Sequence, residues 1–355
     1  MKPENQTGLE RYARQMRYAQ LGLAGQQKLA AGRVLVVGAG ALGSAVAETL
    51  ARAGVGFLRV VDRDLLNLDN LHRQTLYTED DAKRRLPKVE ALTAHISAIN
   101  SEVVVEPLAI QADRTNIAEL MGGIDVLVDC TDNFETRFML NDSAIVAGMS
   151  LVHGGCLGCD GQVFVVIPGQ TPCLRCLMPD GPPETEETCE TVGVLMPIVS
   201  MVAAMQSLEC LKLIAGHSEA VGRQMTVFSM WENRIRQVSL DGLTKNPDFR
   251  CSVCKSGPQN EMSAPTGIPV ASAICGREAV QVVMHGAKDF CLTKLSEKLP
   301  TALSCQLSRF VLKFDIDGIQ VSVFTDGRAV FDGTGDELLA KSFYERYVMP
   351  GPGTK

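Results

Sequence analysis

Short apolar runs alternate with longer amphipathic segments along the first 150 residues. Residues 33–37 and 57–61 are short runs rich in valine, which is typical of buried parallel strands. The alanine-rich segment 44–53 between them predicts a helix that ends at Gly54. Further strands are predicted at 103–105 and 125–129, and further helices at 9–31, 88–99, 116–121 and 135–147. This alternation predicts an α/β fold, a doubly wound Rossmann-like sheet that is mostly parallel.

The pattern changes after residue 150. Four more strands are predicted, at 151–153, 162–166, 224–228 and 234–239. The first two are separated by a glycine-rich segment and are expected to form a hairpin, so the parallel sheet should gain an antiparallel extension. Residues 197–215 are mostly apolar and predict a buried helix.

Residues 256–269 have the composition of a linker, because glycine, proline and polar residues replace the apolar runs. We therefore predict a large α/β domain at 1–255 and a small α+β domain at 270–355. In the small domain, strands are predicted at 308–314, 319–324 and 328–331, and helices at 292–299 and 336–347. The sequence assigns this accessory domain no role.

The composition is that of a globular chain. Of its 355 residues, 46% are hydrophobic and 21% are charged, which excludes a disordered or collagen-like protein. The longest apolar run, 192–205, contains Pro197 and is shorter than the roughly 20 residues that span a bilayer. The net charge of −7 argues against nucleic-acid binding. Since the polar N-terminus lacks the apolar core of a signal peptide, we expect a cytoplasmic protein without a membrane partner.

A glycine-rich turn follows the first predicted strand. Gly38, Gly40 and Gly43 allow the backbone to approach a phosphate, and Ala41 begins a helix whose amides bind anions. Asp62 ends the second strand about twenty residues further on, where a carboxylate can accept ribose hydroxyls. This pattern alone indicates a nucleotide. It leaves open an NAD-dependent dehydrogenase, another nucleotide-binding enzyme or a tight turn without a ligand.

Basic residues near this turn favour ATP over a dinucleotide. Arg73 follows the ribose carboxylate, Lys88 begins a helix, and Arg14 lies in the first helical segment. ATP carries about four negative charges, and attack by a second anion needs still more neutralisation. Each cation alone is more simply a solvated surface charge, but together they favour a functional interpretation. Asp132 follows the strand 125–129 and is suited both to hold Mg²⁺ and to cap the next helix.

Twelve cysteines in a chain without an export signal are expected to be thiols or metal ligands. The sharpest signal is two Cys-x-x-Cys pairs, Cys173 with Cys176 and Cys251 with Cys254. Two such pairs together complete a tetrahedral zinc site, and a redox pair is the alternative. Because sulfur would occupy all four positions on the metal, the zinc is expected to be structural.

Three other cysteines have more than one interpretation. Cys156 and Cys159 form a third Cys-x-x-Cys pair inside the predicted hairpin, where a buried structural role is favoured over a thiol relay. Cys189 lies in an acidic, proline-bearing loop at 178–190 and is either a nucleophile or a bystander.

Taken in order, these motifs resemble the ubiquitin-activating-enzyme-like superfamily, and within it the bacterial adenylyltransferases of the MoeB/ThiF/HesA type. The matching segments begin with Arg11-Tyr-Ala-Arg14-Gln15, Gly38-Ala-Gly-Ala-Leu-Gly43, Asp69-Asn-Leu-His-Arg73-Gln74 and Pro87-Lys88. They continue with Thr131-Asp132-Asn133, Arg137, Asn141, Pro172-Cys173-Leu-Arg-Cys176, Cys189 before Gly193-Val-Leu-Met-Pro197, and Cys251 to Cys254. The resemblance covers residues 8–255 and makes this region an ATP-binding adenylation domain.

The resemblance implies an enzyme that activates a ubiquitin-like sulfur-carrier protein of the MoaD or ThiS type. The C-terminal glycine carboxylate of the carrier would attack the α-phosphate of MgATP, giving an acyl-adenylate and pyrophosphate for molybdopterin, thiamine or thiolation pathways. In this scheme Asp62 holds the ribose, Arg73 and Lys88 contact the phosphates, and Asp132 binds the metal. The full nucleotide set implied is Gly38, Gly40, Ala41, Gly43, Asp62, Asp69, Asn70, Arg73, Lys88, Asp132 and Asn133.

The resemblance also implies a homodimer in which Arg14 reaches into the partner subunit's site. Zinc on Cys173, Cys176, Cys251 and Cys254 matches the family. Cys189 occupies the position of a cysteine that takes part in sulfur transfer in some members, which would involve a sulfur-donor protein. The catalytic set is therefore Arg14, Arg73, Lys88, Asp132 and Cys189.

Two features depart from the family pattern. Ala41 stands where many relatives have glycine, although its amide is still available. The C-terminal domain has no rhodanese-type active-site loop at Cys291 or Cys305. A non-catalytic carrier-binding scaffold remains an alternative, against which the intact site residues argue. An NAD-dependent oxidoreductase is a second alternative, and no residue set for hydride transfer supports it.

Overall fold

The computed structural model describes residues 8–179, 181, 191–240, 242–243, 251–254, 269–273, 278–284, 290–300 and 303–349. The chain divides into two compact units, Met1–Glu261 and Met262–Lys355, which are described separately. Of the predicted linker 256–269, only Pro269 is among the described residues, and it begins a strand.

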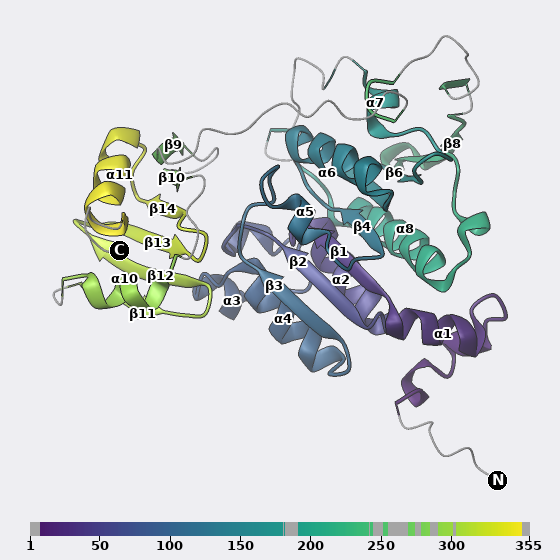
Figure 1. Cartoon of the computed structure of the whole chain (residues 1–355), viewed down its shortest axis with the longest axis horizontal. Helices are drawn as coiled ribbons and strands as arrows, with labels where there is room; N and C mark the ends of the chain where they lie inside the picture. Colours follow the sequence, from purple (N-terminus) through teal and green to yellow (C-terminus); the bar gives the residue numbers. More distant parts are fainter. Residues whose placement is uncertain are drawn as a thin grey trace. The chain divides into compact units, whose positions relative to one another are not determined.

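The first unit is built on one eight-stranded sheet in the order β3-β2-β1-β4-β5-β6-β7-β8 (Figure 1). Its strands are β1 (Arg33–Val37), β2 (Phe57–Val61), β3 (Val104–Leu108), β4 (Val126–Asp129), β5 (Ser150–Leu157), β6 (Asp160–Val166), β7 (Met225–Ser229) and β8 (Arg234–Val238). The strands from β3 to β5 in this order are parallel, and β6, β7 and β8 add antiparallel pairs. The predicted fold class, a mostly parallel sheet with an antiparallel extension, is confirmed.

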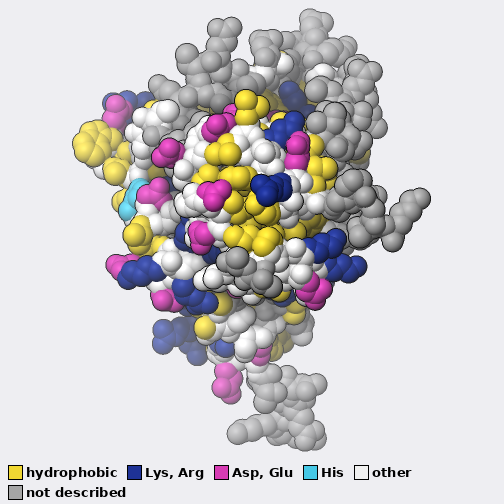
Figure 2. All heavy atoms as spheres, turned by 90° about the vertical axis from the view of Figure 1, so that its left-hand side faces the viewer, with side chains coloured by type: hydrophobic (Ala, Val, Ile, Leu, Met, Phe, Trp, Pro, Cys, Tyr) yellow, Lys and Arg dark blue, Asp and Glu magenta, His cyan; other side chains and the backbone are white. Residues whose placement is uncertain are grey.

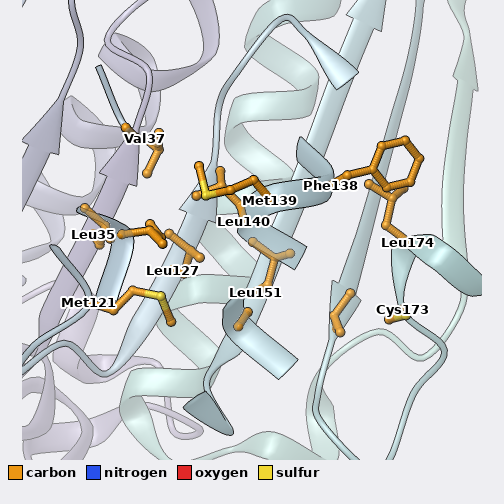
Figure 3. Close-up of a cluster of buried hydrophobic side chains, with 14 of the residues drawn as sticks. Leu35, Val37, Met121, Leu127, Phe138, Met139, Leu140, Leu151, Cys173 and Leu174 are labelled. Carbon is orange, nitrogen blue, oxygen red and sulfur yellow. The ribbon is translucent and has the colours of Figure 1, made fainter. Parts of the chain in front are cut away.

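Helices cover both faces of this sheet. α5 (Ile117–Leu120) and α6 (Phe134–Ala147) pack on one face, where Leu35 and Val37 of β1 belong to one buried cluster with Leu140 of α6 (Figure 3). Val34 and Val36 alternate with these residues and are fully buried toward the other face. On that face α8 (Met196–Ala215) packs against β4, β5 and β6 and against α2 (Ala41–Ala53), which also contacts α4 (Lys88–Ile99).

The α8 helix is long and apolar enough to cross a membrane, but it packs as a core helix. It has 20 residues, and half of its most apolar window is buried inside the protein. Pro197 lies in the first turn, where a missing N–H breaks no helical bond. The helix therefore starts one residue before Pro197, and the proline does not interrupt it.

The segment 9–31 is not one helix, contrary to the prediction. It folds as two short turns, η1 (Glu10–Tyr12) and η2 (Gln15–Arg17), followed by α1 (Gly22–Ala31). The backbone is extended at Tyr18, with ψ of 114°, and Gly22 takes a φ of +58°. The buried ring of Tyr12 holds this entry segment, since its hydroxyl accepts a hydrogen bond from Asn100 Nδ2 at 2.8 Å.

Short elements connect the main ones in the first unit. They are η3 (Leu68–Asn70), α3 (Glu79–Lys83), α7 (Leu174–Leu177), η4 (Ser218–Ala220) and η5 (Met230–Glu232).

Figure 2 shows a face of the molecule on which acidic and basic side chains are interspersed around a group of hydrophobic ones. On the part of this face formed by described residues, no continuous basic surface is visible.

The second unit is a six-stranded antiparallel sheet with helices, as the predicted small α+β domain requires. The strand order is β11-β12-β13-β14-β10-β9. The elements are β9 (Pro269–Ala273), β10 (Ala279–Met284), α10 (Leu292–Lys298), β11 (Gln306–Leu307), β12 (Val311–Ile316), β13 (Ile319–Phe324), β14 (Ala329–Asp332), α11 (Glu337–Phe343) and the π turn η6 (Tyr344–Val348). Its core joins one face of the sheet to both helices, with Phe314, Phe331 and Tyr344 almost fully buried.

Candidate functional site

The glycine-rich turn joins β1 to the start of α2 and is packed against the loop after β4. Gly38 has a φ of +94°, and a Cβ there would lie 2.6 Å from the carbonyl oxygen of Cys130. At Gly43 a Cβ would overlap the carbonyl oxygen of Gly38, so the turn closes tightly on itself. Gly40 precedes the first helical residue, Ala41, and only Gln74 lies near the position of its missing side chain. The turn therefore presents the amide end of α2 at the carboxyl edge of the sheet.

Asp62 lies directly after β2 and faces this turn. Its Oδ2 accepts a hydrogen bond from the Ala39 amide at 2.6 Å, and its Oδ1 accepts one from the Asp64 amide at 2.7 Å. Burial raises the pKa of Asp62 above its ordinary value, and the charge of Lys88 opposes this shift. Each carboxylate oxygen keeps a second lone pair, so a ribose hydroxyl can still be accepted.

Lys88 is the first residue of α4 and is buried beside the same edge. A bridge between Leu65 and Pro87 brings the start of α4 next to the end of β2. The Nζ of Lys88 lies 2.8 Å from Oδ2 of Asp64. Burial by itself would lower the pKa of Lys88, but the carboxylates of Asp62, Asp64 and Asp132 raise it above its ordinary value. A permanently charged ammonium group therefore lies at the edge of the sheet.

Arg73 follows η3, and its neighbours serve mainly to shape that turn. Arg73 Nη1 donates to the carbonyl of Asp69 at 2.8 Å and lies 2.9 Å from Nε2 of His72. The side chain of Asn70 forms hydrogen bonds within the same turn. Its Oδ1 accepts from the backbone amide of Asn67 at 3.1 Å, and its Nδ2 donates to the Asp69 carboxylate at 3.1 Å. Asp69 and Asn70 thus support the turn that carries Arg73.

Asp132 lies between β4 and α6 with an exposed side chain. It does not cap α6, as one sequence interpretation allowed, because Asn133 is the cap and accepts a hydrogen bond from the Thr136 amide at 2.9 Å. Among the described residues no hydrogen bond holds the Asp132 carboxylate, and its charge acts on Lys88. β1, β2 and β4 therefore bring the glycine turn, Asp62 and Asp132 to one edge, at the point where the strand order reverses.

The structure adds three residues to this site that sequence reasoning did not assign. Asp64 pairs with Lys88, and the Tyr77 hydroxyl donates to the carbonyl of Ala39 at 2.6 Å. The side chain of Gln74 is buried beside Gly40, and its Oε1 has no hydrogen-bond partner in the described part of the chain. Gln74 belongs to a motif visible in the sequence, whereas no sequence signal points to Tyr77.

The four cysteines of the two Cys-x-x-Cys pairs form one cluster. All four sulfur atoms, of Cys173, Cys176, Cys251 and Cys254, lie within 4.8 Å of one another. Three of the Sγ–Sγ separations are 3.4, 3.6 and 3.8 Å. Zinc–sulfur bonds of about 2.3 Å in a tetrahedron place the sulfurs about 3.8 Å apart, so the cluster fits a zinc ion. The fold brings together two pairs that lie 78 residues apart in the sequence.

The remaining predicted residues lie apart from this arrangement or outside the described residues. Arg14 is exposed and precedes η2, at the end of α2 that is opposite the glycine turn. Cys189 lies outside the described residues, so its role stays a prediction. Cys156 and Cys159 are half-buried on the β5–β6 hairpin, and the choice between a structural role and a thiol relay stays open.

Comparisons with known proteins relate the chain to adenylyltransferases and an activating enzyme. The chain is 38% identical over 340 residues to a "Sulfur carrier protein ThiS adenylyltransferase" of Bacillus subtilis, covering 95% of this chain and 99% of that protein. It is 38% identical over 252 residues to the "SAMP-activating enzyme E1" of Haloferax volcanii, covering 71% of this chain and 90% of that protein. The crystal structure of E. coli MccB with ATP has a similar fold, with a TM-score of 0.58, 23% identity, and coverage of 69% of this chain and 73% of that one. A ThiF family model matches residues 12–253, and with the full-length relative this match shows that the chain belongs to the ThiF family.

Proposed function

We propose that this protein is an ATP-dependent adenylyltransferase that activates the C-terminal glycine carboxylate of a ubiquitin-like sulfur-carrier protein. The observation that carries the proposal is the meeting of the glycine turn, Asp62, Lys88 and Asp132 at one edge of the sheet. The names of the relatives, which are adenylyltransferases and an activating enzyme, support the same reaction class.

The reaction joins a carrier carboxylate oxygen to the α-phosphorus of ATP, while the bond from that phosphorus to the bridging oxygen breaks and pyrophosphate leaves. Both reactants are anions, so positioning and charge neutralisation supply most of the rate. The amides at the start of α2 donate hydrogen bonds to phosphate oxygens, and the Asp62 carboxylate accepts hydrogen bonds from the ribose hydroxyls. Lys88 and Arg73 neutralise the charge of the phosphates. Asp132 would hold Mg²⁺, a hard cation that takes carboxylate and phosphate oxygens and neutralises further charge.

We further propose a carrier of the ThiS type. The Bacillus subtilis relative, which matches 95% of this chain, is named for ThiS. The Haloferax volcanii enzyme matches 71% of this chain, and an "Adenylyltransferase and sulfurtransferase MOCS3" of Caenorhabditis briggsae matches 72%. The carriers of molybdopterin and thiolation pathways are the competing substrates, and direct comparison in one assay separates them.

The proposed assay is carrier-dependent exchange of pyrophosphate into ATP. We expect exchange only when ATP, Mg²⁺ and a carrier with an intact C-terminal glycine are present, because the carboxylate is the nucleophile. The same carrier without its last two residues is the matched control. Absence of exchange with every carrier of the host, or tight NADH binding without ATP binding, would contradict the proposal.

We also propose that the enzyme acts as a homodimer in which Arg14 completes the partner's site. Gln15, next to Arg14, donates to the Ala53 carbonyl at the C-terminal end of α2 at 2.9 Å, whereas the glycine turn lies at the other end. A helix of 13 residues is about 20 Å long, which exceeds the reach of an arginine side chain. Light scattering should therefore give a mass near twice 38.3 kDa, and a monomeric active enzyme would contradict the dimer.

We also propose that the four-cysteine cluster binds zinc and that the protein is cytoplasmic. Cys189 is proposed to take part in sulfur transfer together with a sulfur-donor protein. The sulfur geometry supports zinc as a structural ion that joins the loop after β6 to the segment that contains Cys251. Adenylation uses no thiol, so Cys189 is assigned only to a later transfer step.

A further inference from the structure

Asp132 lies in a loop of four residues, 130–133, whose backbone is held at several points. The Cys130 amide donates to the carbonyl of Val37 at 2.9 Å, which ties the loop to β1. Asn133 caps α6 and fixes the other end. Between these points the loop could still rotate about Thr131, so the position of the Asp132 carboxylate depends on what holds Thr131.

Thr131 is held from two sides by charged groups. Oδ1 of Asp129 accepts hydrogen bonds from the Thr131 amide at 3.0 Å and from its hydroxyl at 2.7 Å. The Thr131 carbonyl accepts from Nη2 of Arg137 at 2.8 Å. Asp129 is fully buried, so its carboxylate needs a second partner to stay in place.

That partner is His153, which lies beside Asp129 on the neighbouring strand. Asp129 and His153 are paired in register between β4 and β5. Nδ1 of His153 lies 2.7 Å from Oδ2 of Asp129, and because an ionised carboxylate only accepts, Nδ1 is the donor. The ring is 1% exposed and packs against Phe164 with 4.9 Å between ring centroids.

The other ring nitrogen of His153, Nε2, indicates that the residue is kept for its bond to Asp129. Nε2 is buried and has no hydrogen-bond partner among the described residues. A buried polar atom without a partner costs free energy, and an apolar side chain would avoid that cost. Within the described residues, the bond to Asp129 is therefore the single hydrogen bond of the His153 side chain.

We propose that His153 and Asp129 are positioning residues that hold Thr131 so that the carboxylate of Asp132 points toward the bound nucleotide. The chain of contacts runs from His153 to Asp129, from Asp129 to Thr131, and along the backbone to Asp132. This inference rests on the proposed function, since it assigns Asp132 to the nucleotide and its metal. It concerns residues that neither touch substrate nor ligate metal, and outer-shell residues of this kind typically change metal affinity or activity about 10- to 100-fold.

The test compares His153→Leu with His153→Asn. Leucine has a similar size but no donor, whereas the asparagine amide nitrogen can take the place of Nδ1. For His153→Leu we expect kcat of pyrophosphate exchange to fall about 10-fold and the Mg²⁺ concentration for half-maximal rate to rise, with a small change in the KM for the carrier. His153→Asn should restore most of the activity. Calorimetric titration should show weaker binding of ATP with Mg²⁺ to His153→Leu, and unchanged binding of ATP in EDTA.

His95→Leu is the matched control, because it removes another histidine–aspartate pair of the same unit. His95 lies on α4, and its Nε2 is 2.7 Å from Oδ2 of Asp81 on α3. This pair is not part of the chain of contacts that leads from His153 to Asp132. We expect it to lower thermal stability without changing the Mg²⁺ requirement. Unchanged Mg²⁺ dependence in His153→Leu, or equal loss in His153→Leu and His153→Asn, would overturn the inference. Exchange by the wild-type protein tests the proposed function separately, and calorimetry still decides the inference if exchange fails.

Discussion

Replacing Asp132 with alanine is expected to abolish carrier-dependent pyrophosphate exchange, with a loss of about 100- to 1000-fold in kcat. The Asp132 side chain is exposed, no hydrogen bond to a described residue occupies it, and its charge acts on Lys88. The fold therefore does not need this carboxylate, whereas the proposed reaction uses it to hold Mg²⁺ at the triphosphate. Thermal unfolding should change little, because surface substitutions of this kind usually shift stability by about 0.5 kcal/mol or less.

Arg73→Ala is expected to have a similar effect on exchange, because Arg73 is proposed to neutralise the phosphates. The matched control is Asp160→Ala, which removes an exposed carboxylate from the start of β6 in the same unit. It should retain wild-type exchange and thermal stability. Full activity of Asp132→Ala or of Arg73→Ala would refute the corresponding assignment, even if the protein remains an adenylyltransferase.

Loss of zinc is expected to destabilise the first unit strongly. Cys173 and Cys251 are almost fully buried, and their cluster packs into the same core as α6. Cys176→Ser should lose the ion and lower the midpoint of thermal unfolding by about 10 °C or more, which corresponds to roughly 3–5 kcal/mol for a unit of this size. The metal content of the purified wild-type protein, by elemental analysis, should be one zinc per chain.

Cys291→Ser is the matched control for the zinc prediction. Cys291 is exposed and lies in the second unit, so its replacement should change neither the zinc content nor the unfolding midpoint. A wild-type protein purified without zinc, with the same stability as a sample refolded with zinc, would contradict the structural role of the ion. Disulfides between the four cysteines would then be the competing explanation to examine by mass spectrometry.

Much of the first unit was predictable because the signals are local. The runs at 33–37 and 57–61 form β1 and β2 with unchanged bounds, since short valine-rich segments between helices have few other ways to bury both faces. The segment 44–53 is helical from Ala41 onward and ends at Gly54 in the left-handed conformation, as expected for a C-terminal glycine. The antiparallel extension was also expected, because a glycine-rich hairpin follows the parallel strands, whereas the order of the strands came from the structure.

Other elements were missed because their sequences carry weaker patterns. β9 and β10 of the second unit follow directly on linker-like composition, and β9 is mostly exposed at the edge of its sheet, so it lacks the apolar alternation of a buried strand. The helix predicted at 9–31 breaks at Tyr18 and Gly22 because the buried Tyr12 ring and a left-handed glycine set the direction of the chain. The position of the Tyr12 ring depends on a contact with Asn100, which lies 88 residues further along the sequence.

The sequence by itself determined which chemical groups the protein carries and in what order. They are a glycine-rich turn suited to phosphate, a carboxylate after the second strand, three cations, an aspartate after β4 and two Cys-x-x-Cys pairs. The tertiary structure decided how these groups meet. It paired Lys88 with Asp64, gave the cap of α6 to Asn133 instead of Asp132, closed the four sulfurs into one cluster and buried His153 against Asp129. The physical reason is that spacing along a chain reports local conformation, whereas hydrogen bonds and charge pairs at a sheet edge depend on how separate strands are aligned.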